Sequence, residues 1–117
     1  MKSTGELPLS GVRVLDLTTI VFGPYTAQIL GDLGADVIKI EAPRGDPMRS
    51  IGPARNKGMS SIFLGSNRNK RSLVLNLKTD TARDALWRLI ETSDMFIHNV
   101  RPQKIAALGF DPDAVLG

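Results

Sequence analysis

Residues 44–78 concentrate the positive charge of this chain. They hold eight cations and one acid, a net charge of +7, whereas residues 1–43 and 79–117 each carry a net charge of −2. A field concentrated in this way attracts a polyanion. The cations lie mostly in a Gly/Pro/Ser-rich connection with a single aromatic residue, Phe63. A compact, multiply charged small molecule therefore fits better than DNA or RNA, with a solvated basic loop as the alternative.

The composition limits the other kinds of chemistry. The 117 residues suit one domain or one piece of a larger protein, and 42% hydrophobic with 23% charged residues is typical of a globular chain. The absence of cysteine excludes a disulfide framework, a thiolate metal site and a cysteine nucleophile, and with one histidine we expect no metal site. No apolar run approaches the ~18 residues of a membrane span, and the first residues show no signal-peptide core. We therefore expect a soluble, cytoplasmic protein without membrane contact.

The apolar pattern predicts strands that alternate with helices. The strands are expected at residues 12–19, 35–41, 72–78 and 94–100. Helices are expected at residues 24–34, from a Thr79 cap to about residue 90, and at residues 102–109, with the start of another at 111–115. Residues 42–61 are expected to form a long loop, a length that is usually functional or disordered.

This alternation is typical of an α/β fold with a mostly parallel sheet and helices on both faces. Ligands of such sheets bind beyond the carboxyl ends of the strands. Polar residues follow the predicted strands at that edge: Thr18, Thr19, Glu41, Lys78, His98, Asn99 and Arg101. The sequence therefore predicts the site at one edge of the sheet.

Three separated stretches carry a family resemblance. "LPLSGVRVLDLTTIVFGPYTAQILGDLGADVIKIEAPRGDPMR", "NRNKRSLVLNLK" and "FIHNVRP" with a following "LGF" closely resemble the family III coenzyme A transferases, from about Leu7 to the end. That family includes formyl-CoA transferase, carnitine CoA-transferase and α-methylacyl-CoA racemase. The resemblance implies that residues 1–117 are the N-terminal part of a Rossmann-like, CoA-binding domain in a larger interlocked fold. A second domain and the catalytic aspartate region would then be absent from this chain.

By the same resemblance, nine residues are expected to contact coenzyme A: Val21, Phe22, Leu75, Asn76, Leu77, Lys78, Asn99, Val100 and Arg101. The first two would line the coenzyme beside its thioester. Two positions depart from the family pattern, because Ala42 and Ala107 stand where its members often carry cations. Arg44 and Lys104 are near enough in sequence to replace them.

The resemblance also implies an activity. Family transferases move coenzyme A between carboxylic acids through an aspartyl anhydride, and their nucleophile would lie beyond Gly117, so we expect no catalytic residue in this chain. The expected partners are an acyl-CoA and a carboxylic acid, with coenzyme A as substrate and no permanently bound cofactor. The full-length parent is expected to be a homodimer. A 2-methylacyl-CoA racemase or epimerase and a non-catalytic CoA-binding or scaffold module remain alternatives.

Some of these residues have a second interpretation. Glu41 lies where a dinucleotide-binding acid would sit, but "IVFGP" is no G-x-G-x-x-G and Pro24 has no backbone N–H for a phosphate, so NAD is disfavoured. His98 is expected to be a core histidine bonded to backbone in preference to a catalytic one. Asn99 could contact ligand or cap the following helix, and Phe22 could pack in the core or line an acyl pocket.

The cations on either side of the third predicted strand are expected to have different roles. Arg68, Lys70 and Arg71 precede that strand and Lys78 ends it, roughly 23 Å of extended chain away. The two groups therefore cannot hold the same phosphate. Lys78, at the carboxyl end, is the phosphate candidate, and side chains of the triplet are expected to pair structurally and to order the long loop.

Overall fold

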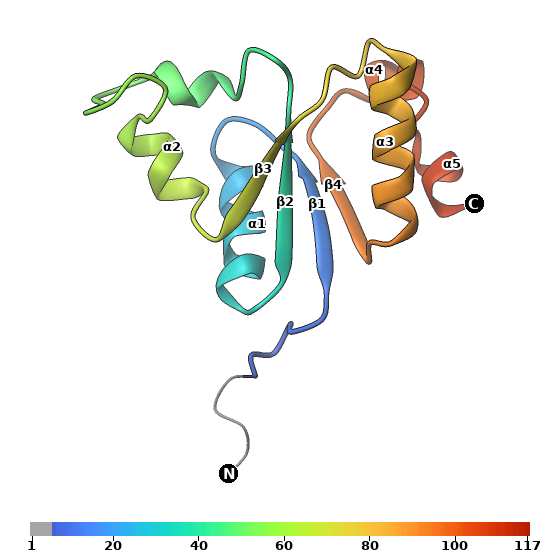
Figure 1. Ribbon diagram of the computed structural model, residues 1–117, viewed down its shortest axis with the longest axis horizontal. Coiled ribbons are helices and arrows are strands. Elements are labelled where there is room, and N and C mark those ends of the chain that lie inside the picture. Colours follow the sequence, from blue (N-terminus) through green and yellow to red (C-terminus); the bar gives the residue numbers. More distant parts are fainter. Residues whose placement is uncertain (1–5) are drawn as a thin grey trace.

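The computed structural model describes residues 6–117, which form an α/β fold around one parallel sheet (Figure 1). Its strands in this part of the chain are Arg13–Leu17 (β1), Asp36–Glu41 (β2), Lys70–Val74 (β3) and Met95–His98 (β4). They lie in the order β3-β2-β1-β4, and every neighbouring pair is parallel. The predicted parallel α/β fold is confirmed.

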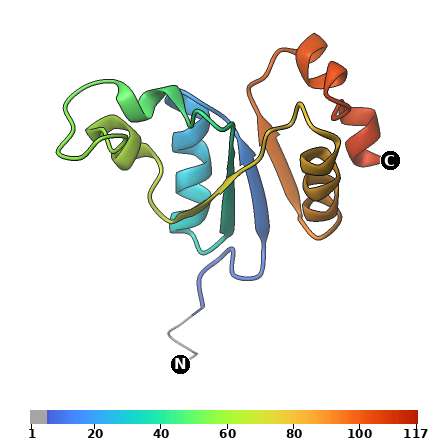
Figure 2. The same cartoon turned by 45° about the horizontal axis from the view of Figure 1, so that its top comes forward.

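Helices cover both faces of this sheet, as Figure 2 shows with α1 and α3 on opposite sides. The helical segments are Phe22–Asp32 (α1), Pro47–Ser50 (η1, a 3₁₀ turn), Ser61–Ser66 (α2), Asp80–Glu91 (α3), Pro102–Ala107 (α4) and Pro112–Leu116 (α5). Val14 and Val37 of the strands pack with Ala27 of α1 on one face. On the other face, an apolar cluster joins the strands to α3, α4 and the connection between α4 and α5: Leu15, Leu17, Ile38, Ile40, Leu86, Ile105 and Phe110.

The period of two in β1 and β2 gives the α1 face two different halves. Near the start of the strands this face is apolar, with Val14 and Val37 buried. The next positions with the same orientation are charged, and Asp16, Lys39 and Glu41 are 0%, 1% and 5% exposed. The half of the sheet closest to the strands' carboxyl ends therefore carries buried charge on this face.

The third strand starts earlier than the sequence predicted. Its bounds are Lys70–Val74, not 72–78, so Lys70 and Arg71 belong to the strand and residues 75–78 form the turn before α3. The prediction failed because two cations suggested a loop. The ion pairs of Lys70 and Arg71 with acids on β1 and β2 allow both to stand in a strand at the edge of the sheet.

The segment expected as a long loop contains local structure. Asp46 caps η1 by accepting a hydrogen bond from the Met48 N–H (2.9 Å), with Pro47 at the first position. The α2 helix begins at the last residue of this segment, Ser61, and is capped by Ser60, whose hydroxyl accepts from the Phe63 N–H (3.2 Å). Both caps use residue types that favour helix starts, a signal that sequence analysis did not use.

The other predicted elements are confirmed, with ends that differ by one or two residues. The α1 helix begins at Phe22, two residues before the predicted start at Pro24, and Gly34 ends it with a φ of +106°. Thr79 caps α3, its hydroxyl accepting from the Ala82 N–H (3.3 Å), and Asp80 lies in the first turn. The predicted start of a last helix is also present, as α5.

Candidate functional site

A cleft of about 790 Å³ lies at the carboxyl ends of the strands, the upper end of the sheet in Figure 1. Its walls come from the ends of β1 and β2 and from three connecting segments, residues 42–47, 75–78 and 99–101. Lys104 of α4 and Leu108, just after that helix, complete the lining. In the sheet, the chain proceeds from β1 to β2 and β3 in one direction, and β4 then pairs with the opposite edge of β1. Parallel sheets bind ligands at the carboxyl side of such a reversal, so this cleft is the candidate site.

Seven of the nine residues predicted to contact a ligand line this cleft: Leu75, Asn76, Leu77, Lys78, Asn99, Val100 and Arg101. They come from two connections that lie on opposite sides of β1 and β2 in the sheet order. The fold thus brings together two sequence segments that are more than 20 residues apart. Their contact with a ligand stays a prediction.

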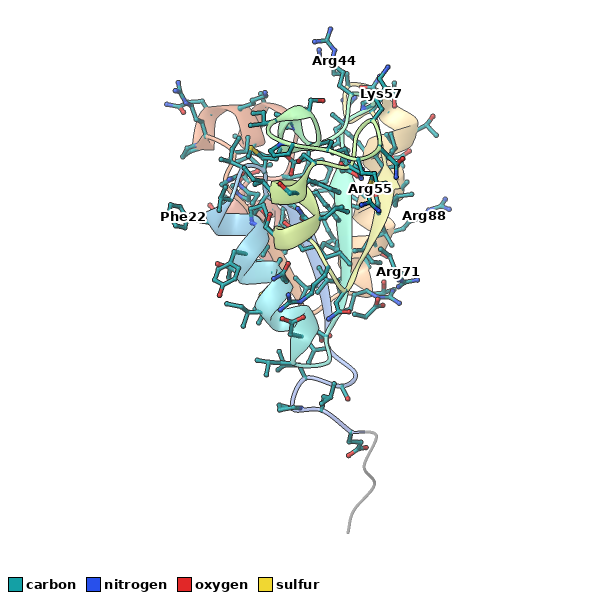
Figure 3. The ribbon with its side chains drawn as sticks, turned by 90° about the vertical axis from the view of Figure 1, so that its left-hand side faces the viewer. Phe22, Arg44, Arg55, Lys57, Arg71 and Arg88 are labelled. Atoms are coloured by element: carbon teal, nitrogen blue, oxygen red, sulfur yellow. The ribbon has the colours of Figure 1, made fainter. Side chains whose placement is uncertain are left out.

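Val21 and Phe22 do not line the cleft. Val21 is 36% exposed and Phe22 is 87% exposed, and Figure 3 shows the Phe22 side chain projecting away from the molecule. The interpretation of Phe22 as a core residue is therefore wrong, because nothing in residues 6–117 covers its ring. Its contact with an acyl group stays a prediction.

Four exposed cations surround the cleft: Arg44, Lys78, Arg101 and Lys104. None of them forms an ion pair with an acid of residues 6–117. Both cations expected to replace the family's missing ones, Arg44 and Lys104, lie in this set, and Ala42 lines the same wall. Beside them the lining is largely apolar, with Leu17, Ile40, Leu75, Leu77, Val100 and Leu108. This arrangement suits a ligand with several phosphates and an apolar arm.

The cation triplet pairs with acids away from the cleft, which confirms the structural pairing, but none of these acids lies in residues 42–61, so the expectation that the triplet orders the long loop is wrong. Arg68 contacts Asp32 (2.8 Å) and Arg71 contacts Asp36 (2.7 Å), both on the surface. The hydrogen bond from Arg68 holds the pKa of Asp32 below its ordinary value. Burial opposes the same effect at Asp36, but the hydrogen bonds from Arg71 and Arg13 outweigh it and lower that pKa. Figure 3 shows Arg71 far from Arg44, toward the amino ends of the strands.

Two buried ion pairs fix the wall formed by residues 42–50. Lys39 Nζ lies 2.9 Å from Asp46 Oδ2, at an angle outside hydrogen-bond geometry, and donates to the Thr18 carbonyl (3.0 Å). Glu41 accepts two hydrogen bonds from Arg49, each 2.8 Å, and one from the Asp46 N–H (2.9 Å). These contacts tie the connection after β2 back onto β2 itself.

Glu41 is held as a carboxylate by these donors. Burial raises its pKa, but hydrogen bonds from Arg49, Ser72 and the Asp46 N–H outweigh burial and lower the pKa to about 2. Glu41 also raises the pKa of Arg49, chiefly by the hydrogen bonds between them. Because its oxygens are occupied by these donors, Glu41 is not the ribose-binding acid of a dinucleotide site.

Arg49 also accounts for the aromatic residue of the basic segment. The Arg49 guanidinium carbon lies 3.9 Å from the ring centroid of Phe63, which is 6% exposed. Phe63 therefore packs α2 against η1 and is not free to stack on a ligand. Sequence analysis missed this charge network. The available signal was the alternation in "VIKIE", which places Lys39 and Glu41 on one face of a buried strand.

His98 and Asn99 have structural contacts at the end of β4. His98 Nδ1 accepts from the Val100 N–H (3.1 Å), which confirms the interpretation of a backbone-bonded histidine. Asn99 accepts from the Thr19 N–H (3.2 Å) and donates to the Thr19 carbonyl (2.8 Å). The prediction that Asn99 caps α4 is wrong, because Arg101 holds the capping position without a side-chain hydrogen bond.

A second hollow of about 440 Å³ lies against β4, between α3 and α5. Its lining includes Asp94 and apolar side chains such as Phe96 and Leu116, and it has no lysine or arginine. It is therefore a poor match for an anionic ligand. In residues 6–117 no three His, Asp or Glu side chains gather in a way that could hold a metal ion, and no helix there has the length and apolarity to cross a membrane.

Comparisons with known proteins relate this chain to one family. Residues 9–116 match the model of CoA-transferase family III. A probable fatty acyl-CoA transferase of Mycobacterium tuberculosis is 43% identical over 109 residues, which are 91% of this chain and 27% of that protein. The succinyl-CoA:glutarate CoA-transferase of Mus musculus is 44% identical over 103 residues, which are 87% of this chain and 24% of that enzyme.

Solved structures show the same fold. A CAIB/BAIF family protein from Brucella suis superposes with a TM-score of 0.88 at 36% identity, covering 94% of this chain and 30% of that one. The chain thus spans about a quarter to a third of the length of the relatives that it matches. Because the family model covers nearly all of the residues and these relatives share over a third of their aligned positions, the chain belongs to CoA-transferase family III.

Proposed function

We propose that the cleft holds the phosphates and the start of the pantetheine arm of an acyl-CoA. The observation that carries this proposal is the group of four exposed cations beside an apolar lining at the carboxyl ends of the strands. Coenzyme A carries a 3′-phosphate and a diphosphate on an apolar arm, so it needs both kinds of surface. Lys78 and Arg101 stand on opposite connections and can reach different phosphates of one ligand.

The proposed reaction is the transfer of coenzyme A between carboxylic acids through an aspartyl anhydride. Two of the relatives are named as a probable fatty acyl-CoA transferase and a succinyl-CoA:glutarate CoA-transferase, which favours this reaction over racemisation. No residue of this chain serves as nucleophile in the proposal. Asp16 and Asp46 are 0% and 3% exposed and each faces a buried lysine, so neither carboxylate can attack a thioester.

The proposed organisation follows from the length of the relatives. Residues 1–117 would be the first part of the CoA-binding domain of a longer homodimeric enzyme, in which the nucleophile comes from another segment. A scaffold module that only holds the coenzyme is the contrasting case. The enzyme and the scaffold module would both bind CoA, but only the enzyme would transfer it.

The test uses the complete reading frame that contains this chain. Calorimetric titration with CoA and dephospho-CoA measures binding, and an assay with succinyl-CoA and octanoyl-CoA as donors to free dicarboxylates and fatty acids measures transfer. We expect CoA binding, weaker dephospho-CoA binding and transfer from at least one donor, whereas the 117-residue chain alone transfers nothing. A complete protein that binds no CoA would refute the proposal. CoA binding with no transfer to any acceptor would favour the scaffold module, and exchange of the α-proton would favour a racemase.

A further inference from the structure

The turn after β1 holds a strained residue. Ile20 has a φ of +79°, in the left-handed region. A β-branched side chain is rarely found there, because its Cβ substituents crowd the backbone. The other residue besides glycine with positive φ in residues 6–117 is Asn69, a type that tolerates this conformation. Such strain persists only where the surrounding structure fixes the backbone on both sides.

Three side chains fix the backbone just before Ile20. Asp16 Oδ1 accepts hydrogen bonds from the Thr18 N–H (2.8 Å) and from the Thr18 hydroxyl. Lys39 Nζ donates to the Thr18 carbonyl (3.0 Å). Asn99 forms hydrogen bonds with both backbone polar groups of Thr19, accepting from its N–H (3.2 Å) and donating to its carbonyl (2.8 Å). The backbone of Thr18 and Thr19 is thus bound by side chains from β1, β2 and the end of β4.

The backbone just after Ile20 is fixed by close packing. A Cβ on Gly23 would lie 2.5 Å from the Thr18 Cβ, so the first turn of α1 rests directly on Thr18. The Tyr25 N–H donates to the Val21 carbonyl (2.8 Å) and begins that helix. Ile20 therefore joins two fixed segments, and Val21 and Phe22 emerge from the turn exposed, at 36% and 87%.

Among the three side chains that hold Thr18 and Thr19, Asn99 is the one that connects β4 to β1, where the direction of the strand order reverses. It follows β4, whereas Thr19 follows β1, and these two strands are neighbours on either side of the point where the chain order reverses. Both residues line the cleft. Its two hydrogen bonds place the backbone that leads directly into the left-handed residue.

We propose that Asn99 is a positioning residue that holds the Thr19 peptide groups, keeps Ile20 left-handed and thereby aims Val21 and Phe22 toward the acyl end of the bound thioester. This inference rests on the proposed function for the identity of the ligand and on the predicted contact of Val21 and Phe22 with its acyl group. It gives Asn99 a role through the backbone of another strand, distinct from a contact with the coenzyme itself. Without Asn99, Ile20 can relax to negative φ and carry Val21 and Phe22 to new positions.

The binding test compares acyl selectivity with affinity for the adenosine end. In the complete protein, calorimetry measures Kd for acetyl-CoA, octanoyl-CoA and adenosine 3′,5′-bisphosphate. For Asn99→Ala we expect the ratio of the two acyl-CoA Kd values to shift by about tenfold, since small displacements of positioning groups have effects of this size or more. The Kd for the bisphosphate should change by a smaller factor than this ratio. Asn99→Asp keeps the side-chain size and loses the donor to the Thr19 carbonyl, so it should shift the ratio in the same direction.

A second substitution separates positioning from direct contact. Glycine adopts a φ near +79° without steric cost, so Ile20→Gly in the Asn99→Ala protein should restore the acyl ratio. Ile20→Val keeps the β-branch and should not restore it. If Asn99→Ala weakens all three ligands and Ile20→Gly restores none of them, Asn99 is a direct ligand contact and the proposal is wrong.

Amide hydrogen exchange tests the same contacts without any ligand. Asn99→Ala should speed exchange at the Thr19 N–H, with no change at the Thr18 N–H, which Asp16 still holds. Unchanged exchange at Thr19 would overturn the positioning role even in a protein that binds CoA normally. Faster exchange at Thr19 in a protein that binds no acyl-CoA would support the hold on the turn and refute the proposed function instead.

Discussion

Lys70 of β3 and Asp16 of β1 form a buried ion pair on one face of the sheet, although 54 residues separate them in the sequence. Lys70 Nζ and Asp16 Oδ2 are 2.7 Å apart, and the side chains of Lys70 and Asp16 are 2% and 0% exposed. Lys70 Nζ also donates to the Pro24 carbonyl (2.9 Å) and to Asn67 Oδ1 (2.7 Å), so each of its protons has an acceptor. Burial lowers the pKa of Lys70 despite the attraction of Asp16. This cation therefore serves the fold and is not available to a ligand.

Replacing Lys70 should be far more harmful than replacing its neighbour. Lys70→Met leaves Asp16 buried without its cation and should lower the free energy of unfolding by about 3–5 kcal/mol. Arg71→Met removes an ion pair whose guanidinium side chain is 66% exposed and should cost less than about 1 kcal/mol. Urea denaturation at pH 7 measures both variants.

The matched control adds Asp16→Asn to the Lys70→Met protein. Asparagine keeps an oxygen for the Thr18 N–H and removes the unpaired buried charge, so part of the lost stability should return. Equal destabilisation by Lys70→Met and Arg71→Met, with no recovery in the double variant, would contradict a buried ion pair.

Replacing Lys78 should weaken coenzyme binding first. Lys78 is exposed and lines the cleft, so Lys78→Ala should reduce CoA affinity by about 1–2 kcal/mol, the scale of one partly exposed charge-assisted contact, without changing stability. Arg71→Ala is the control, because Arg71 contacts Asp36 away from the cleft. Calorimetric titration of the complete protein measures both. Normal binding by Lys78→Ala together with loss of CoA by a stable Arg71→Ala protein would reverse the assignment.

Glu41 should dominate part of the acid dependence of stability. Its pKa is about 2 in the folded state against an ordinary value of 4.5. The carboxylate therefore contributes stability that is fully present above about pH 5 and is lost as the pH falls toward about 2. At about 1.4 kcal/mol per pKa unit, this contribution is on the order of 3–4 kcal/mol.

The variant Glu41→Gln should remove this acid dependence. It should be less stable than the parent chain at pH 7 by on the order of 3–4 kcal/mol, because Arg49 loses its buried partner. The difference should shrink as the pH falls toward about 2, where Glu41 is half protonated. Urea denaturation at several pH values measures it. A constant difference across that range would show that Glu41 keeps an ordinary pKa.

Two glycines should respond oppositely to alanine. At Gly23 an added Cβ would lie 2.5 Å from the Thr18 Cβ, so Gly23→Ala should destabilise the chain by about 1–3 kcal/mol. Gly65 lies in α2 with nothing within 4 Å of an added Cβ, and Gly65→Ala should stabilise by about 0.5–1 kcal/mol. Thermal unfolding compares them. A Gly23→Ala protein as stable as the parent would mean that the turn after β1 can shift to accept the added Cβ at little cost in free energy.

Local patterns in the sequence were sufficient for the architecture and for the edge that carries the site. Buried runs such as "VRVLDL" and "DVIKIE" separated by periodic helices allow few arrangements other than a parallel sheet, and parallel strands end at a common edge. The structural pairing of the triplet was also expected, although the third strand runs over Lys70–Val74 and not over 72–78, and the role of Lys78 stays a prediction. The inferences about the architecture and the edge succeeded because each depends on neighbours along the chain.

The partners of the charged residues were decided only by the tertiary structure. The alternation in β2 places Lys39 and Glu41 on one face, but only the strand order and the path of residues 42–50 bring Asp46 and Arg49 to them. In the same way, the ion pairs of Lys70 with Asp16 and of Arg71 with Asp36 explain why β3 could begin at Lys70. Buried charges are tolerated only when opposite charges meet them, and that meeting depends on how distant segments pack.

The turn after β1 shows the same division between sequence and tertiary structure. The sequence by itself determined that Thr18 and Thr19 lie at the carboxyl end of a strand, at the edge of the sheet that carries the cleft, because short-range pattern and strand direction fix that position. It did not determine that Ile20 is left-handed or that Asn99 holds Thr19, 80 residues away. A strained conformation has no local signal in an isoleucine, since its own preference opposes it. Contacts from other strands supply the free energy that maintains it, and these exist only in the folded chain.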